Sequence, residues 1–159
     1  MNGRIPALLI LGAALVAGVG VWYAQEYGFY YEIEEDSPAA LDIVIQTTQG
    51  AAHFPAAYNK SIDATSSPLR WRACMERTGP LPADAIPYTN PTPLIGPGWF
   101  SCFDAGRIAA DLASGAAKAY LSQPEIRPDV DRVIAVYPDG RAFGWHQFND
   151  KTPERGVMD

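Results

Sequence analysis

Two cysteines, Cys74 and Cys102, are the residues whose types and spacing most clearly indicate chemistry. In an oxidising compartment, two cysteines in one small domain usually pair as a disulfide. The crosslink would close a proline-rich loop of 28 positions and remove roughly 3–4 kcal/mol of chain entropy from the unfolded state. The alternative is two buried free thiols. Since no C-x-x-C occurs, the spacing indicates neither a thioredoxin-like redox site nor covalent haem attachment.

The other residue types that do chemistry are sparse. His53 and His146 are the only histidines, and neither lies in a motif of spaced metal ligands. A structural zinc site needs about four Cys or His ligands, so we expect no metal and no bound cofactor. The chain also lacks a nucleophile elbow, a glycine-rich phosphate loop and a zinc-protease helix. These observations predict a protein that is not an enzyme.

An acidic run lies after the first aromatic residues and comprises Glu32, Glu34, Glu35 and Asp36. Such a run is usually a solvated turn. A more specific interpretation is that the run forms a surface that steers a basic electron carrier, such as a cytochrome c, along a membrane. The whole chain has 12 Lys and Arg against 18 Asp and Glu, a net charge of -6. This charge argues against a nucleic-acid partner, because phosphates demand clustered cations.

The pair Trp99-Phe100 follows Pro97-Gly98 and forms an apolar corner. Such a corner is either a plug in the core or an anchor for a protein partner. Its position beside Cys102 favours the core.

The elements that position these residues begin with a membrane anchor. Residues 5–25 contain no charged side chain. The apolar stretch Ile5–Tyr23 would form about 28 Å of helix, which matches a hydrocarbon core of about 30 Å. Interfacial aromatic residues follow, beginning with Trp22. The rival interpretation is a cleaved signal peptide, which the length of the stretch and these bulky residues disfavour.

Charge predicts the orientation of this span. Arg4 precedes it and acidic residues follow it, so the positive-inside rule places residues 1–4 in the cytoplasm and residues from 26 onward outside. Within the span, small residues predict a face on which another helix packs closely. The set comprises Gly12, Ala14, Ala17 and Gly18. The alternative is ordinary lipid contact, because Gly and Ala are common in spanning helices.

The outer domain, residues 26–148, is predicted to be α+β, with an antiparallel sheet and one main helix, followed by a polar tail at 149–159. Alternation and β-branched residues predict strands at 29–33, 41–47 and 69–75. Asp104 is the expected N-cap of the helix. Asp139-Gly140 predicts a hairpin between strands 132–137 and 141–148. Residues 49–68 and the six-proline segment 79–98 are expected to be irregular, and 117–121 is left open between a strand and the helix tail.

Four segments carry a resemblance: MNGRI at the start, SSPLRWRAC at 66–74, GPGWFSCFDA at 96–105 and DRVIAVYPDGRAFGWHQFN at 131–149. The chain resembles an uncharacterised family of small membrane-anchored proteins from alphaproteobacteria, chiefly Rhodobacter-like and Paracoccus-like organisms. The resemblance implies a bacterial inner membrane with the outer domain in the periplasm. It carries no function and no site residues.

We therefore expect a non-catalytic accessory subunit or assembly factor of an inner-membrane complex. The implied host suggests a respiratory complex, such as a haem–copper oxidase or a cytochrome bc complex. Its partners would be an integral membrane complex, membrane lipid and a basic cytochrome c. The alternative is a membrane-anchored periplasmic sensor or ligand-binding module, and an unrecognised enzyme ranks last.

Overall fold

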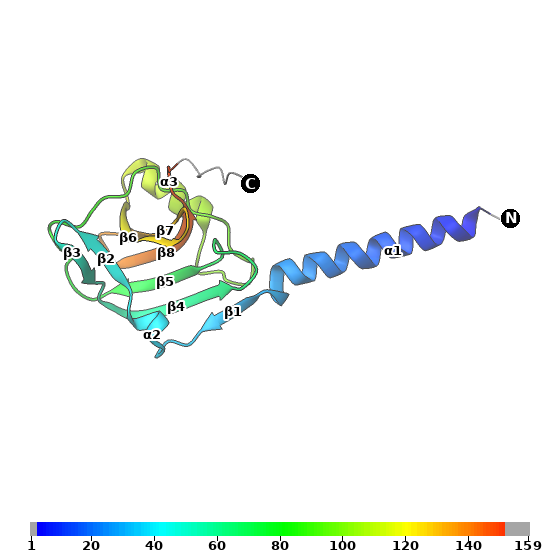
Figure 1. Ribbon diagram of the computed structural model, residues 1–159, viewed down its shortest axis with the longest axis horizontal. Helices are drawn as coiled ribbons and strands as arrows, with labels where there is room; N and C mark the ends of the chain where they lie inside the picture. Colours follow the sequence, from blue (N-terminus) through cyan, green and yellow to red (C-terminus); the bar gives the residue numbers. More distant parts are fainter. Residues whose placement is uncertain (1–2, 152–159) are drawn as a thin grey trace, which may run out of the picture.

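The computed structural model describes residues 3–151, without the side chains of Tyr58 and Asn59, and shows a long helix joined to a sheet domain (Figure 1). Helix α1, Arg4–Tyr23, buries none of its residues and projects away from the domain. Together with the turn that follows it, the helix is long and apolar enough to cross a membrane. The predicted N-terminal span is therefore present as a helix.

A six-stranded antiparallel sheet forms the body of the outer domain, in the order β1-β4-β5-β8-β7-β6. Helix α1 passes through a π-helical turn, η1 (Ala24–Gly28), directly into the edge strand β1 (Tyr30–Ile33). The other strands are β4 (Ala56–Ala64), β5 (Arg72–Arg77), β6 (Lys118–Arg127), β7 (Val130–Val136) and β8 (Arg141–Phe148). Helix α1 is thus continuous with one edge of the sheet.

Smaller elements cover the two faces of this sheet. A hairpin of β2 (Val44–Thr47) and β3 (Gly50–His53) follows the short helix α2 (Pro38–Leu41) and lies over one face. Helix α3 (Ala105–Ser114) and the loop before it lie over the other. The architecture is α+β with one main helix, as predicted.

Alternation along the central strands builds a core on each face. In β7, Val133 faces α3, whereas Ile134 faces the β2–β3 hairpin. The first core also contains Trp145 and Phe100, and we call it the helix-side core. The second contains Trp71, and we call it the hairpin-side core. Because the central strands bury side chains on both faces, the sheet needs both covers.

Local signals in the sequence are confirmed where they set the ends of elements. The carboxylate of Asp104 accepts a hydrogen bond from the backbone N–H of Arg107 at 3.0 Å, which caps α3. Gly115 ends the helix at φ +79°. Gly140 closes the β7–β8 turn at φ +99°, a conformation that favours glycine.

The expectation that residues 49–68 are irregular is wrong, because the whole of β3 and β4 lies there. Strand β4 pairs with β1 on one side and β5 on the other, and this pairing overrides a weak local pattern. The strand predicted at 41–47 begins only at Val44, since Pro38–Leu41 is helical. Residues 117–121, left open, mostly belong to β6. Of the predicted tail 149–159, residues 152–159 lie outside the described residues, as do residues 1–2.

The predicted disulfide is present. Cys74 in β5 is joined to Cys102 in the loop before α3, with Cα atoms 6.3 Å apart. Cys74 lies in the helix-side core and Cys102 is exposed. The bond therefore ties the proline-rich loop to the central sheet.

We expect Cys102→Ala to lower the free energy of unfolding by roughly 3–4 kcal/mol, because it opens a crosslinked loop of 28 positions while removing little packing. Urea titration of the detergent-solubilised full-length protein measures the change. Wild-type protein treated with a reductant is the matched control and should lose a similar amount. A loss below about 1 kcal/mol in both samples would contradict the stabilising role of the crosslink.

Candidate functional site

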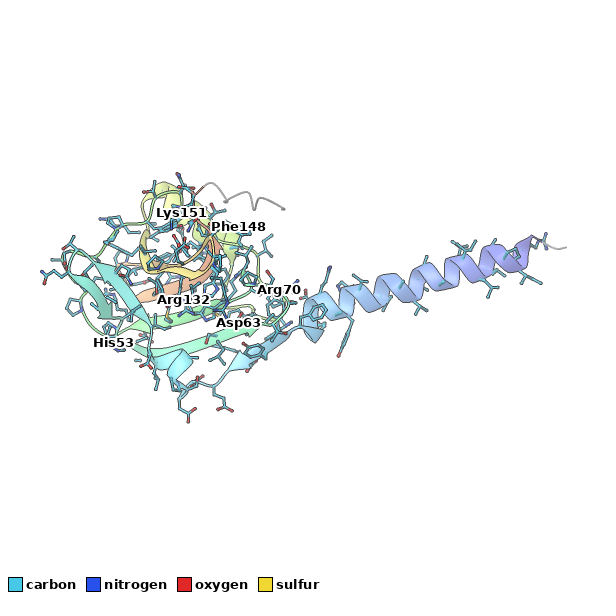
Figure 2. The ribbon with its side chains drawn as sticks, in the orientation of Figure 1. His53, Asp63, Arg70, Arg132, Phe148 and Lys151 are labelled. Atoms are coloured by element: carbon cyan, nitrogen blue, oxygen red, sulfur yellow. A yellow bond between two sulfur atoms is a disulfide. The ribbon has the colours of Figure 1, made fainter. Side chains whose placement is uncertain are left out.

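A cleft of about 610 Å³ continues the hairpin-side face of the sheet beyond the core. Its walls come from β1, β4, the loop after β4, the β6–β7 turn, β7 and β8. The residues that line it include Tyr31, Asp63, Ser67, Arg127, Arg132 and His146. A second hollow of about 570 Å³ lies next to it under α2 and shares Tyr31, Asp63 and Arg132. Figure 2 shows Asp63 and Arg132 on the sheet, between the β2–β3 hairpin and the end of α1.

Arg132 forms the floor of the cleft. Its guanidinium lies over the ring of Trp71 at 4.2 Å, and its Nε donates a hydrogen bond to His146 Nε2 at 3.1 Å. Burial lowers the pKa of Arg132 to about 10, so the side chain stays cationic at neutral pH. Its two terminal nitrogens make no hydrogen bond to any residue that the structure describes.

His146 holds that guanidinium in place. Its Nδ1 lies 2.8 Å from the carbonyl oxygen of Pro68. A carbonyl only accepts, so Nδ1 carries the proton and Nε2 is free to accept from Arg132. The imidazole also stacks on Trp71 at 5.1 Å. Burial, and then the charge of Arg132, lower the pKa of His146 to about 3. The ring is therefore neutral and acts as a fixed acceptor.

Asp63 provides the acid of the cleft. Its Oδ1 accepts the backbone N–H of Ala64 at 2.7 Å, while Oδ2 has no hydrogen-bond partner in residues 3–151. Burial raises the pKa of Asp63, and the charges of Arg132 and Arg127 partly oppose that rise. Across the described part of the chain, no carboxylate oxygen lies within 4.0 Å of Arg132. A half-buried cation and a half-buried acid thus share the cleft without forming an ion pair.

Arg72 shows what a purely structural buried arginine looks like in this fold. The residue is 2% exposed. Its guanidinium donates to four backbone carbonyl oxygens at 2.7–3.2 Å, those of Leu69, Trp71, Leu94 and Ile95. These bonds attach the proline-rich loop to β5. Arg132 differs because its terminal donors face the cleft instead of the backbone.

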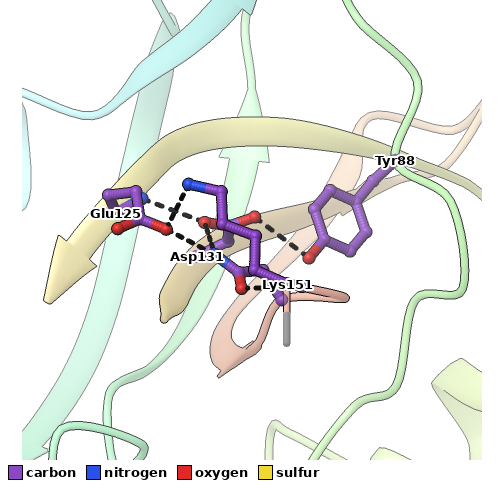
Figure 3. Close-up of polar contacts among 5 residues, drawn as sticks. Tyr88, Glu125, Asp131 and Lys151 are labelled. Carbon is purple, nitrogen blue, oxygen red and sulfur yellow. Dashed lines mark hydrogen bonds and ion pairs between the residues drawn. The ribbon is translucent and has the colours of Figure 1, made fainter. Parts of the chain in front are cut away.

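A separate polar network lies at the same β6–β7 end of the sheet, around Asp131, the residue before Arg132 in β7 (Figure 3). Asp131 accepts from the Tyr88 hydroxyl at 3.1 Å and from the backbone N–H of Glu125 at 2.9 Å. Glu125 accepts from Asn149 and forms an ion pair with Lys151 at 2.8 Å. Both carboxylates in this network already have partners within the chain, so we interpret the network as structural.

The junction between helix and domain is held by the segment that contains the predicted anchor. Trp99 Nε1 donates to the Glu26 carbonyl at 2.7 Å, and the backbone N–H of Gly98 donates to the Glu26 carboxylate. The Trp99 ring packs edge-on against Tyr30. Phe100 is 2% exposed in the helix-side core. Both aromatic side chains therefore make their contacts within the chain.

The other predicted residues lie outside the cleft or at its rim. Glu32 is in β1 and Glu34, Glu35 and Asp36 follow it, all exposed. His53 is exposed at the end of β3, apart from His146 (Figure 2). Within residues 3–151 no group of three or more His, Cys, Asp or Glu side chains is placed to hold a metal ion.

The model of a family of unknown function, DUF6446, matches residues 41–155. The chain belongs to this family. The match includes the hairpin, α3 and five strands of the main sheet, but not α1 or β1. No curated protein and no solved structure matches the chain.

Sequence reasoning missed the cleft residues of this DUF6446 protein. The alternation in RVIAVY places Arg132 on the same face as Ile134, so its orientation could be inferred. Its contact with Trp71 and His146 could not, because Trp71 comes just before β5 and His146 lies in β8.

We expect acid to destabilise the protein through His146. Because its folded pKa lies below the ordinary 6.5, the unfolded chain binds the extra proton as pH falls from 6.5 toward 3. The free energy of unfolding should therefore fall by about 2 kcal/mol between pH 7 and pH 5. His146→Asn keeps a donor for the Pro68 carbonyl but does not titrate, so it should lose this part of the pH dependence. Urea titrations at both pH values measure it.

The matched control is His53→Asn, at an exposed position, which should keep the wild-type slope. Identical pH dependence in wild type and His146→Asn would contradict a neutral buried His146.

Proposed function

We propose that this protein is a single-pass, non-catalytic accessory subunit or assembly factor of an integral membrane complex. The observation that carries the proposal is the junction at Glu26, where Gly98 and Trp99 bind the end of the helix. Arg70 adds to it by lying over the ring of Tyr30 at 5.2 Å. A helix and a domain held this way present one continuous surface, which suits a subunit that packs along a larger complex.

The face of α1 supports a helix partner. At 3.6 residues a turn, Ala14, Ala17 and Gly18 lie on one side of the helix, and Gly12 lies on the other. The face on which a partner helix could pack closely therefore contains three of the four predicted residues. A Cβ added at Gly18 or at Gly12 would meet no atom of this chain within 4 Å. Any penalty for a larger side chain therefore comes from outside the chain.

The loop beside the junction supports contact with lipid. Ile95 is 85% exposed, and it lines a hollow of about 390 Å³ together with Gln25, Glu26 and Arg70. An exposed apolar side chain next to the end of a spanning helix suits the membrane interface, with the arginine near lipid headgroups.

The host and the compartment belong to the proposal as well. The positive-inside rule and the family resemblance support a bacterial inner membrane of an alphaproteobacterium, with a cytoplasmic N-terminus and a periplasmic domain. In that setting we propose a respiratory complex, either a haem–copper oxidase or a cytochrome bc complex. The exposed acids Glu32, Glu34, Glu35 and Asp36 lie at the end of β1 that is farther from α1 (Figure 1), and their negative charge suits steering of a basic cytochrome c.

A second candidate function is a membrane-anchored ligand-binding module. The cleft favours it, because a concave site of this volume with a few convergent polar groups is typical of small-molecule sites.

We expect Gly18→Leu to reduce copurification of the protein with its complex at least severalfold, because a leucine would separate two closely packed helices. Affinity purification of the tagged full-length protein from its native membranes in mild detergent, with quantitative mass spectrometry, measures retention. Gly12→Leu is the matched control on the opposite side of α1 and should retain the partners. Equal retention in the two variants would remove helix packing from the proposal.

We expect the triple variant Glu32→Gln, Glu34→Gln and Glu35→Gln to slow encounter with a basic cytochrome c at low ionic strength and to leave the rate at high salt unchanged. Exposed charges act over about a Debye length and are screened by salt. Stopped-flow oxidation of the carrier by purified complex at several salt concentrations measures the effect. If the rates at low salt were unchanged, the steering role would be rejected and the acidic run would be interpreted as a solvated turn.

A further inference from the structure

We infer that the cleft binds the carboxylate of a small organic acid in the fork of Arg132, with a second polar group of that acid donating to Asp63. This inference deepens the second candidate function and rests on it. It is independent of whether the chain is an accessory subunit.

The first step is that the guanidinium of Arg132 has no anionic partner in the described chain. Buried cations in proteins are normally paired with an anion or fully hydrogen-bonded. Arg72 meets this rule through four backbone carbonyls. Arg132 is only half-buried, and within the described chain its Nε alone is hydrogen-bonded, to a neutral ring, so its terminal nitrogens are open to the cleft. An anion in the cleft would supply the missing partner.

The second step is pre-organisation of the guanidinium. Trp71 supports its plane at 4.2 Å and His146 fixes its Nε edge at 3.1 Å. The two terminal nitrogens are left as a planar fork of fixed orientation. Such a fork matches the two oxygens of a carboxylate, and holding it in advance reduces the entropy lost on binding.

The third step is the opposite wall. Asp63 Oδ2 and the Tyr31 hydroxyl line the cleft and have no hydrogen-bond partner in the described chain. Asp63 and Arg132 both line the cleft of about 610 Å³ and lie more than 4.0 Å apart, so they do not neutralise each other by direct contact. A carboxylate oxygen accepts, and it therefore attracts a hydroxyl or ammonium donor of the ligand.

Charge decides between a carboxylate and a phosphate. The cleft contains Arg127 and Arg132 against Asp63, and the adjoining hollow adds Glu32, Glu34 and Asp42. The cleft alone carries a charge of +1, which a monoanionic carboxylate neutralises, whereas a dianionic phosphate would add an excess negative charge next to the three acids of the hollow. The ligand class is therefore a small hydroxy acid or amino acid.

The test is a binding titration of the full-length protein in detergent micelles, followed by backbone amide NMR shifts of residues 63–68 and 130–134. The probes are acetate, lactate, alanine and inorganic phosphate. We expect saturable shifts, with lactate or alanine binding at least fivefold more tightly than acetate and phosphate binding most weakly. A preference for lactate identifies the second group as a hydroxyl, and a preference for alanine as an ammonium.

Two variants assign the binding to its residues. Arg132→Lys keeps the charge but loses the fork, and should weaken binding at least tenfold. Asp63→Asn should leave acetate affinity unchanged and remove the preference for lactate or alanine. Arg141→Gln, at an exposed arginine outside the cleft, is the matched control and should bind as wild type.

The amide spectrum of each variant reports whether it folds, and Asp63→Asn tests the site even if Arg132→Lys does not. No saturable shift for any carboxylate, tighter binding of phosphate, or wild-type selectivity in Asp63→Asn would each overturn the inference. None of these results bears on copurification with a membrane complex.

Discussion

The indole of Trp71 packs against Gly144 in strand β8, and this contact organises both the hairpin-side core and the floor of the cleft. A Cβ at position 144 would lie 2.5 Å from the ring, so only glycine permits the approach. With the indole in this place, the guanidinium of Arg132 lies over its ring at 4.2 Å and the imidazole of His146 stacks on it at 5.1 Å. The orientation of a charged side chain in the cleft thus depends on the absence of a methyl group one strand away.

The same contact links stability to site geometry. Trp71 is 1% exposed and packs with the β2–β3 hairpin residues of the hairpin-side core. The opposite face of the sheet is closed by α3 and by the loop that the disulfide fixes to β5. Loss of either cover would expose apolar strand faces and loosen β5 and β8 together. The floor of the cleft is therefore built on the central strands β7 and β8, whereas its walls come from β1, β4 and two connecting segments.

Features that depend on neighbouring residues were predictable from the sequence. The uncharged span of α1, the Asp104 cap and the Asp139-Gly140 turn each rest on a few consecutive positions. The disulfide followed from composition and compartment. Strand β4 was missed because its residues alternate weakly, and two neighbouring strands supply the order.

The cleft was missed for a related reason. Asp63, Arg132 and His146 come from three different strands, and the carbonyl that fixes the His146 tautomer comes from Pro68 in a loop. Nothing in the spacing of these residues indicates that they meet. The central location of β8, between β5 and β7, brings them together.

The junction at Glu26 has a consequence for rotation about the membrane normal. Because α1, η1 and β1 form one continuous backbone clamped by Gly98 and Trp99, the azimuth of the helix and the azimuth of the domain are locked together. Each residue of an α-helix advances by about 100°, so the number of residues in this short connection sets which side of the domain stands above the small-residue face. The π-helical turn thus sets the rotational relation between α1 and the surface of the sheet domain.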